Sequence, residues 1–163
     1  MPASAMARQE IDIHTTAPAE PAAVWRLLGD SSTWPAWTPI ETATIERPAD
    51  ENGLGEIRSF KTGRVTVREE IVERKAERRL SYKLLGGLAV RDYRADIDLT
   101  PTAGGTEIRW HTTFTAKVPG SGWLYRRALE RATLRFVDGL ASTPLTTTVV
   151  VSRRRHPASR LHT

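Results

Sequence analysis

The feature that most restricts the fold is a series of six strand-like runs between residues 40 and 116, separated only by short turn signals. The runs span residues 40–47, 56–62, 64–74, 79–85, 89–100 and 106–116. The segments between them are rich in Gly, Pro, Asp and Asn, as in PADENGLG at 48–55 and PTAGG at 101–105. Parallel neighbours need a crossover of about a dozen residues. The runs therefore predict consecutive antiparallel strands.

One more strand and a short helical segment precede this series. Residues 8–15 alternate between apolar and polar side chains, which predicts a half-buried strand and brings the sheet to about seven strands. The segment 18–28 has two prolines near its start and an apolar side that ends before Gly29, as a short helix should. Together with the WPAW corner at 34–37, this segment fits two short helices after the first strand.

A long amphipathic helix follows the strands. From Pro119 onward, apolar residues recur at steps of three and four, and arginines lie mostly around them. The apolar stripe consists of Tyr125, Leu129, Ala132, Phe136 and Leu140. It predicts about five helical turns. Trp123 and Leu134 lie off this stripe and need another partner, for which a second subunit in a homodimer is one candidate. Residues 144–152, PLTTTVVVS, favour an extended conformation with no defined place in the sheet.

These elements predict an α+β domain. A helix with one apolar face must bury that face, and a curved antiparallel sheet offers one concave side to cover it. We expect the sheet to wrap around the long C-terminal helix and to leave a cavity where the two do not mesh. The chain then divides into a flexible N-terminus (1–7), a ligand-binding domain (8–143) and a basic tail (144–163).

The net charge of +5 belongs mostly to this tail. Residues 152–163 hold four arginines and no acid, and without those four the chain has 20 basic residues against 19 acidic ones. A nearly neutral domain gives little reason to expect nucleic acid as a partner. An interaction of the Arg-rich tail with nucleic acid or a membrane is the lowest-ranked alternative.

The composition also restricts the chemistry and the location. Cysteine is absent, which excludes disulfides, a Cys-ligated zinc and a thiol nucleophile. No segment has the apolar length of a signal peptide or of a membrane span, so we expect a cytoplasmic protein without stable membrane insertion. The four histidines cannot be combined into a metal cluster or a catalytic triad, and no phosphate-binding loop is present, so neither a metal nor a cofactor is predicted.

Six segments, taken in order, resemble the bacterial polyketide cyclase/dehydrase and lipid transport family, whose members are often called SRPBCC proteins. The segments are WPAWTP, GEIRSF, TVREEIVE, RRLSYKLLGGLAVRDYRADIDLTP, GGTEIRW and VPGSGWL. The order of elements likewise resembles the helix-grip fold of the START-like superfamily, and the resemblance covers residues 8–142. It implies the fold more than the activity, because the same fold serves lipid carriers, cyclases, hormone receptors and stress proteins.

Strand alternation identifies the side chains that face the predicted cavity. Glu69 shares the parity of Val67 and Ile71, so a carboxylate points toward the apolar side of its strand. The WPAW corner can serve as a core plug or as a cavity wall, and Trp37 is the residue we expect to border the cavity. The full set of predicted ligand-binding residues is Trp37, Arg58, Phe60, Glu69, Tyr82, Arg91, Tyr93, Trp110, Thr112, Phe114 and Phe136.

Two interpretations of this polar set stay open. An apolar hollow with a few convergent polar groups is typical of a small-molecule site. Alternatively, Arg58 and Glu69 form an internal ion pair and the tyrosines only satisfy neighbouring groups. We predict a protein that binds a hydrophobic small molecule, lipid-like, aromatic or polyketide-like. The enzymatic alternative is a polyketide cyclase or dehydratase that uses Glu69 as acid or base, with Tyr82 or Tyr93 orienting a carbonyl group.

Overall fold

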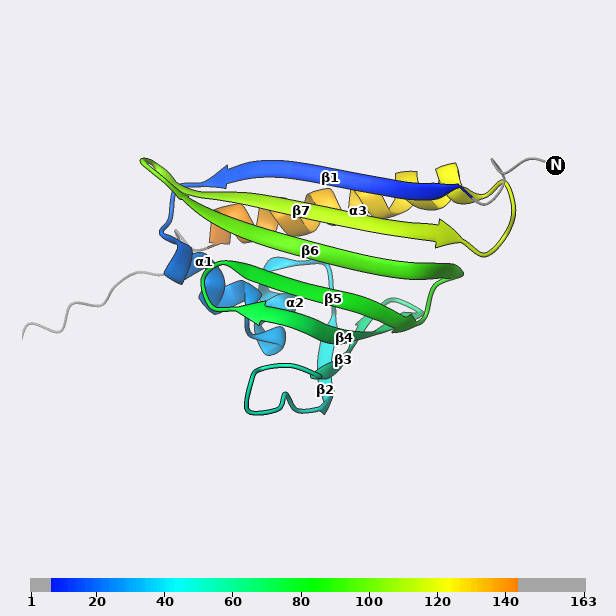
Figure 1. The fold of residues 1–163 in the computed structure, drawn as a ribbon, viewed down its shortest axis with the longest axis horizontal. Helices are drawn as coiled ribbons and strands as arrows, with labels where there is room; N and C mark the ends of the chain where they lie inside the picture. Colours follow the sequence, from blue (N-terminus) through cyan, green and yellow to red (C-terminus); the bar gives the residue numbers. More distant parts are fainter. Residues whose placement is uncertain (1–6, 144–163) are drawn as a thin grey trace, which may run out of the picture.

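The computed structural model describes residues 7–143 and contains a seven-stranded antiparallel sheet with one long helix on one side (Figure 1). The strands are β1 (Arg8–Ala17), β2 (Thr42–Arg47), β3 (Ile57–Thr62), β4 (Val65–Lys75), β5 (Arg79–Gly86), β6 (Val90–Thr102) and β7 (Gly105–Ala116). The helices are α1 (Pro21–Leu28), α2 (Trp34–Trp37) and α3 (Gly122–Ser142), with a 3-10 turn at Ser31–Thr33. The α+β class, the seven strands and the helix-grip arrangement predicted from the sequence are confirmed.

The order of strands across the sheet is β1-β7-β6-β5-β4-β3-β2. Strands β2 to β7 pair with their neighbours in sequence, as the short turns between them require. Strand β1 is the exception, because it pairs with β7 at the far end of the domain and places Ile13 opposite Trp110. The two ends of the domain sequence therefore meet at one side of the sheet.

Helix α3 packs mainly against β1 and β7. Its last turns reach the WPAW corner, where Gly139 lies directly against the Trp37 carbonyl group. Trp34 is fully buried and its ring stacks on Phe60 at a centroid distance of 4.9 Å. The corner is therefore part of the hydrophobic core.

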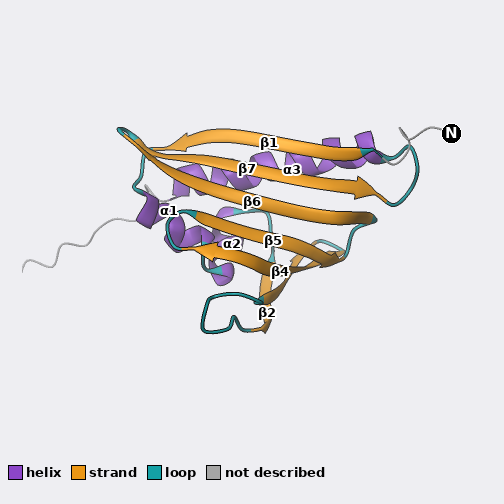
Figure 2. Cartoon of the chain, viewed as in Figure 1, coloured by secondary structure: helices purple, strands orange, loops and turns teal. Residues whose placement is uncertain are grey.

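Helices α1 and α2 cover one end of the sheet, opposite the turn between β5 and β6 (Figure 2). Helix α3 makes its main contacts with β1 and β7, at one side of the sheet, and not with β3, β4 and β5. This arrangement leaves a space between the middle strands and α3. The strand predicted at 144–152 and the basic tail at 144–163 lie outside the described residues, as does all but Ala7 of the N-terminal segment 1–7.

Candidate ligand-binding cavity

A cavity of about 150 Å³ lies between the middle strands and α3. Its lining is mostly apolar, and three of its polar side chains, Glu69, Tyr82 and Tyr93, come from three adjacent strands. The lining residues are Ile40, Phe60, Thr62, Val67, Glu69, Tyr82, Leu84, Leu88, Tyr93, Leu129, Ala132, Thr133 and Phe136. An apolar hollow with a few convergent polar groups has the composition of a small-molecule site.

The size of the cavity restricts what fits inside. An apolar cavity of roughly 150 Å³ holds one benzene-sized ring, whereas sites for drug-sized ligands occupy roughly 300–1,000 Å³. The lining residues Thr62, Leu84 and Leu88 are exposed or half-buried, so the cavity opens between the β3–β4 turn, the end of β5 and α3. A larger ligand can therefore place one ring inside and extend through this opening.

Glu69 is the acidic side chain in the lining, and it is paired with Arg58. The Nε and Nη2 atoms of Arg58 each lie 2.9 Å from Oε2 of Glu69. Arg58 is fully buried and Glu69 nearly so. Both contacts go to Oε2, and among residues 7–143 no group hydrogen-bonds to Oε1. The second carboxylate oxygen is therefore free to accept a hydrogen bond from a ligand.

Arg58 itself is enclosed by aromatic rings. Its guanidinium carbon lies 4.1 Å from the centroid of Trp34, 4.7 Å from Phe60 and 4.9 Å from Tyr82. Each of these distances is within cation–π range. The rings and Glu69 together hold the charge in place, so Arg58 fixes the orientation of the carboxylate.

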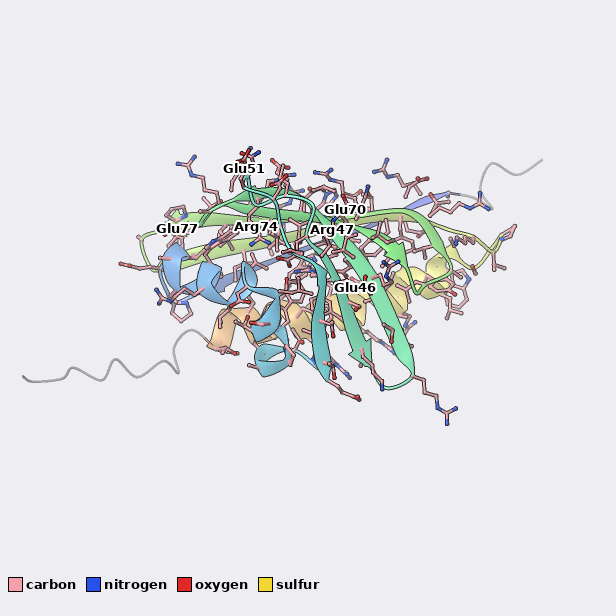
Figure 3. All side chains as sticks on the ribbon, turned by 90° about the horizontal axis from the view of Figure 1, so that it is seen from below. Glu46, Arg47, Glu51, Glu70, Arg74 and Glu77 are labelled. Carbon is pink, nitrogen blue, oxygen red and sulfur yellow. The ribbon has the colours of Figure 1, made fainter. Side chains whose placement is uncertain are left out.

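The polar contacts continue from Arg58 away from the cavity. Arg58 Nη1 donates to Ser31 Oγ at 3.2 Å, and the Ser31 hydroxyl donates to Glu56. Glu56 pairs with Arg74, which also donates to the Gly29 carbonyl oxygen at 2.6 Å. Figure 3 labels Arg74 beside the loop that joins β2 and β3. The cavity carboxylate is thereby linked to the segment after α1 through a continuous series of polar contacts.

Burial determines the protonation of the cavity groups. It raises the pKa of Glu69 above the ordinary value of 4.5, although the charge and hydrogen bond of Arg58 lower it. Burial and the neighbouring Glu69 charge raise the pKa of Tyr93 to about 12. Burial also raises the pKa of Tyr82 well above 10.0. Both phenols are therefore protonated at neutral pH and can donate hydrogen bonds to a ligand.

The structure brings five of the eleven predicted site residues into the cavity lining: Phe60, Glu69, Tyr82, Tyr93 and Phe136. Four others, Arg58, Trp110, Thr112 and Phe114, are buried behind that lining. Arg58 acts through Glu69, while the Trp110 ring packs on Phe136 at 5.9 Å and the Phe114 ring stacks on Tyr93 at 6.2 Å. The internal ion pair predicted as an alternative is present, and the pair also borders the cavity.

Two placements differ from the expectation. Trp37 is buried but does not line the cavity, because it packs against Trp34 at 4.8 Å and donates its Nε1 hydrogen to Thr33. Arg91 is exposed, so its predicted inward position is wrong. A β-bulge between Arg91 and Arg94, with Asp92 at φ 51°, inserts one residue and reverses the alternation before it. Val90 therefore faces the core in place of Arg91.

Eight lining residues were not in the predicted set: Ile40, Thr62, Val67, Leu84, Leu88, Leu129, Ala132 and Thr133. The signal for some of them was in the sequence, because Val67 shares the parity of Glu69, and Leu129 and Ala132 lie on the apolar stripe of the helix. For Thr62 and Leu88, which lie at or next to turns, no periodicity exists. Their place follows only from where α3 crosses the sheet.

Metal sites and membrane-spanning helices are two other features that a chain of this kind could carry. Among residues 7–143 no group of three or more His, Asp or Glu side chains is arranged to hold a metal ion. Within the same residues, no helix has the length and apolar character needed to cross a bilayer.

The curved sheet gripping a C-terminal helix, with a cavity between them, defines a helix-grip protein with a ligand-binding fold of the polyketide cyclase type. Residues 8–143 match the family described as polyketide cyclase / dehydrase and lipid transport, and the chain belongs to that family. The resemblance seen in the sequence is thus confirmed. No curated protein sequence matches the chain.

Solved structures share the fold at low sequence identity. Norcoclaurine synthase from Thalictrum flavum, in complex with dopamine and hydroxybenzaldehyde, is 16% identical with a TM-score of 0.66, over 86% of this chain and 88% of that one. A protein from Thermus thermophilus is 21% identical with a TM-score of 0.68, over 86% and 99%. The di-domain ARO/CYC protein StfQ of the steffimycin biosynthetic pathway is 15% identical with a TM-score of 0.71, over 82% and 49%. At these identities the comparisons show the fold alone.

Proposed function

We propose that this protein binds a hydrophobic small molecule and places one aromatic ring of it in the cavity between the middle strands and α3. The observation that carries the proposal is the lining, in which apolar and aromatic side chains surround one carboxylate oxygen without a protein partner among the described residues. Such an oxygen would accept a hydrogen bond from a phenolic hydroxyl group. The ring itself would contact Phe60, Tyr82 and Phe136.

Two structural relatives support this class of ligand. The Thalictrum flavum enzyme was solved with dopamine and hydroxybenzaldehyde, which each contain one ring, and StfQ is described as a di-domain ARO/CYC protein of the steffimycin biosynthetic pathway. The volume of about 150 Å³ agrees with a single ring inside this protein. A polyketide-like or lipid-like remainder would extend past Leu84 and Leu88, at the open end of the cavity.

The test is an NMR titration of the full chain with phenol and with 1-naphthol. We expect saturable shifts that are confined to the cavity lining. Ala132→Met adds a side chain inside the cavity and should weaken binding about ten-fold or more, because the space for the ring is lost. Ala128→Met makes the same change on the exposed side of α3 and should leave the affinity unchanged.

Two outcomes would contradict the proposal. One is the absence of saturable binding by either probe. The other is binding that Ala132→Met and Ala128→Met leave equally intact, since the probes would then occupy some other surface.

A second candidate function is catalysis in the same cavity, favoured by the raised pKa of Glu69. A carboxyl group with a raised pKa is a stronger base than an exposed one and can act as a general acid or base, and the Tyr82 and Tyr93 hydroxyls can donate hydrogen bonds to a carbonyl oxygen. This arrangement suits cyclisation or dehydration of a polyketide-like chain. Glu69→Gln should abolish turnover of such a substrate and retain binding of the ring. Full turnover in the folded variant would remove Glu69 from the role.

A further inference from the structure

The outer side of α3 carries apolar side chains that are exposed in the structure of residues 7–143. Trp123 is 61% exposed and Leu124 54% exposed, at the start of the helix. Val118 in the preceding loop and Leu134 further along the helix are also exposed. The cavity faces the opposite side of this helix, through Leu129 and Ala132. These apolar groups are therefore not part of the ligand site.

Arginines lie on the same side of the helix. Arg127, Arg131 and Arg135 follow Trp123 at successive steps of four residues, which places them along one line on the helix surface. All three are exposed, and none pairs with a carboxylate among residues 7–143. On the outer face of the sheet, by contrast, Arg79 and Arg109 are paired with acids.

Two turns of this helix form a shallow hollow in which the two kinds of side chain meet. Trp123, Leu124, Arg127, Ala128 and Arg131 line it, and we call this set the outer α3 patch. Tryptophan at the border of an apolar and a polar phase, beside arginines whose charges remain in water, is the composition of a helix that lies in a membrane interface.

We propose that the outer α3 patch docks on the surface of a bilayer that contains anionic phospholipid. The unpaired arginines complement phosphate headgroups, and each basic residue near such a surface adds to the attraction. Trp123 and Leu124 reach below the headgroups, where their apolar area is removed from water. The helix lies on the bilayer and does not cross it.

Two other kinds of partner fit the outer α3 patch less well than a lipid surface. A second copy joined through the same patch about a two-fold axis would bring arginines of one copy toward arginines of the other. A nucleic acid would satisfy the arginines but would leave Leu124 and Val118 without an apolar partner. A lipid surface supplies both kinds of contact.

The patch lies near the open end of the cavity. The loop between β7 and α3 is held to the β5–β6 turn by a hydrogen bond from the Lys117 amide to the Ala89 carbonyl oxygen at 2.9 Å. Leu88 in that turn lines the cavity. In Figure 1 the first turn of α3 and the β5–β6 turn lie at the same end of the molecule. A docked molecule would hold its cavity opening close to the bilayer, although docking does not depend on the proposed ligand.

The experiment is co-sedimentation of the full chain with vesicles. We expect binding to mixed phosphatidylcholine and phosphatidylglycerol vesicles, weaker binding at high salt, and none to phosphatidylcholine alone. Trp123→Ser and the double variant Arg127→Glu with Arg131→Glu should each weaken partitioning about ten-fold or more. Because these side chains are exposed, the variants should keep the circular dichroism spectrum and thermal midpoint of the parent protein.

The matched control is a double variant with the same charge change elsewhere, Arg26→Glu with Arg78→Glu, at exposed positions in α1 and in the β4–β5 turn. It should bind vesicles as the parent does. Equal loss in both double variants would show that net charge alone governs binding and would overturn the proposal. Undiminished binding of the α3 variants would also overturn it, because another part of the chain would then bind the vesicles. A dimer that Trp123→Ser dissociates, without any vesicle binding, would identify a second copy as the occupant instead.

Discussion

At the scale of single residues, Arg58 is the side chain whose burial most needs a compensating partner. It carries a charge at full burial, and Glu69 is the anion that offsets that charge. Removing one partner of such a pair leaves the other charge buried without compensation. Glu69 belongs both to this ion pair and to the cavity lining. A change at the pair should therefore affect the stability of the domain and the shape of the cavity together.

We expect Arg58→Met to lower the free energy of unfolding by about 3–5 kcal/mol at neutral pH. Methionine fills much of the space but leaves the Glu69 carboxylate without its cation. Urea denaturation of the variant and the parent measures the difference. Arg68→Met is the matched control on β4, since Arg68 pairs with Glu46 at the surface, and such exposed pairs contribute little to stability.

The cost of Arg58→Met should also depend on pH. Burial alone then acts on Glu69, so its pKa rises further above 4.5. A carboxyl group with a higher pKa in the folded state favours folding fully below its unfolded pKa, and that contribution is lost as the pH rises through the raised value. The difference between variant and parent should therefore shrink as the pH falls toward 4.5. A cost that stays constant between pH 7 and pH 4.5 would contradict the role assigned to Glu69.

At the scale of elements, the contact between α3 and the WPAW corner fixes how the helix crosses the sheet. Gly139 lies so close to Trp37 that a Cβ atom there would overlap the Trp37 carbonyl oxygen. That oxygen belongs to the backbone of a short helix whose neighbouring Trp34 is fully buried. Neither side of the contact can move without repacking the core.

We expect Gly139→Ala to destabilise the protein by about 1–3 kcal/mol, as overpacking does. Alanine in an exposed helix position would instead stabilise by about 1 kcal/mol relative to glycine. Gly122→Ala in the same helix is the control, because its Cβ would meet only the flexible side chain of Gln9. Thermal unfolding should give a lower midpoint for the first variant and an equal or higher one for the second. A higher midpoint for Gly139→Ala would show that the backbone at Trp37 moves to accommodate the added methyl group.

The elements also show where sequence reasoning succeeds and where it ends. Alternation placed Phe60, Glu69, Tyr82 and Tyr93 correctly, because side chains within an unbroken strand keep a period of two. It failed at Arg91, since a single inserted residue at Asp92 reverses the parity and leaves no periodic trace in the sequence. The sequence could not show whether Trp37 lines the cavity or packs in the core. Its position depends on the close contact with Gly139, which lies in a helix about a hundred residues later in the chain.

At the scale of the whole molecule, the two faces of the sheet have opposite responses to pH. On the inner face, burial raises the pKa of Glu69. On the outer face, hydrogen bonds lower the pKa of acids: that of Asp12 through Arg109, and that of Asp96 through Ser81 and two arginines. A group with a lowered pKa stabilises the fold above its unfolded pKa and loses that contribution as the pH falls through the lowered value. The outer face should therefore govern unfolding in acid.

Asp96 tests this division. Burial alone would raise the pKa of Asp96, but hydrogen bonds from Ser81, Arg79 and Arg94 outweigh burial and lower it. The Ser81 hydroxyl lies 2.6 Å from Oδ1 of Asp96, and Nη2 of Arg79 lies 2.8 Å from the same atom. We expect Asp96→Asn to cost about 1–3 kcal/mol at pH 7, since hydrogen bonds to a charged group are lost.

This cost should fade as the pH falls below 3.8 through the lowered pKa, because the parent then also carries a neutral side chain. Urea denaturation at a series of pH values measures both curves. Asp92→Asn is the control on the same strand, since Asp92 is exposed and asparagine tolerates its positive φ. That variant should follow the parent at every pH. If Asp96→Asn costs as much in strong acid as at pH 7, its effect comes from packing, and the acid sensitivity of the fold must lie elsewhere.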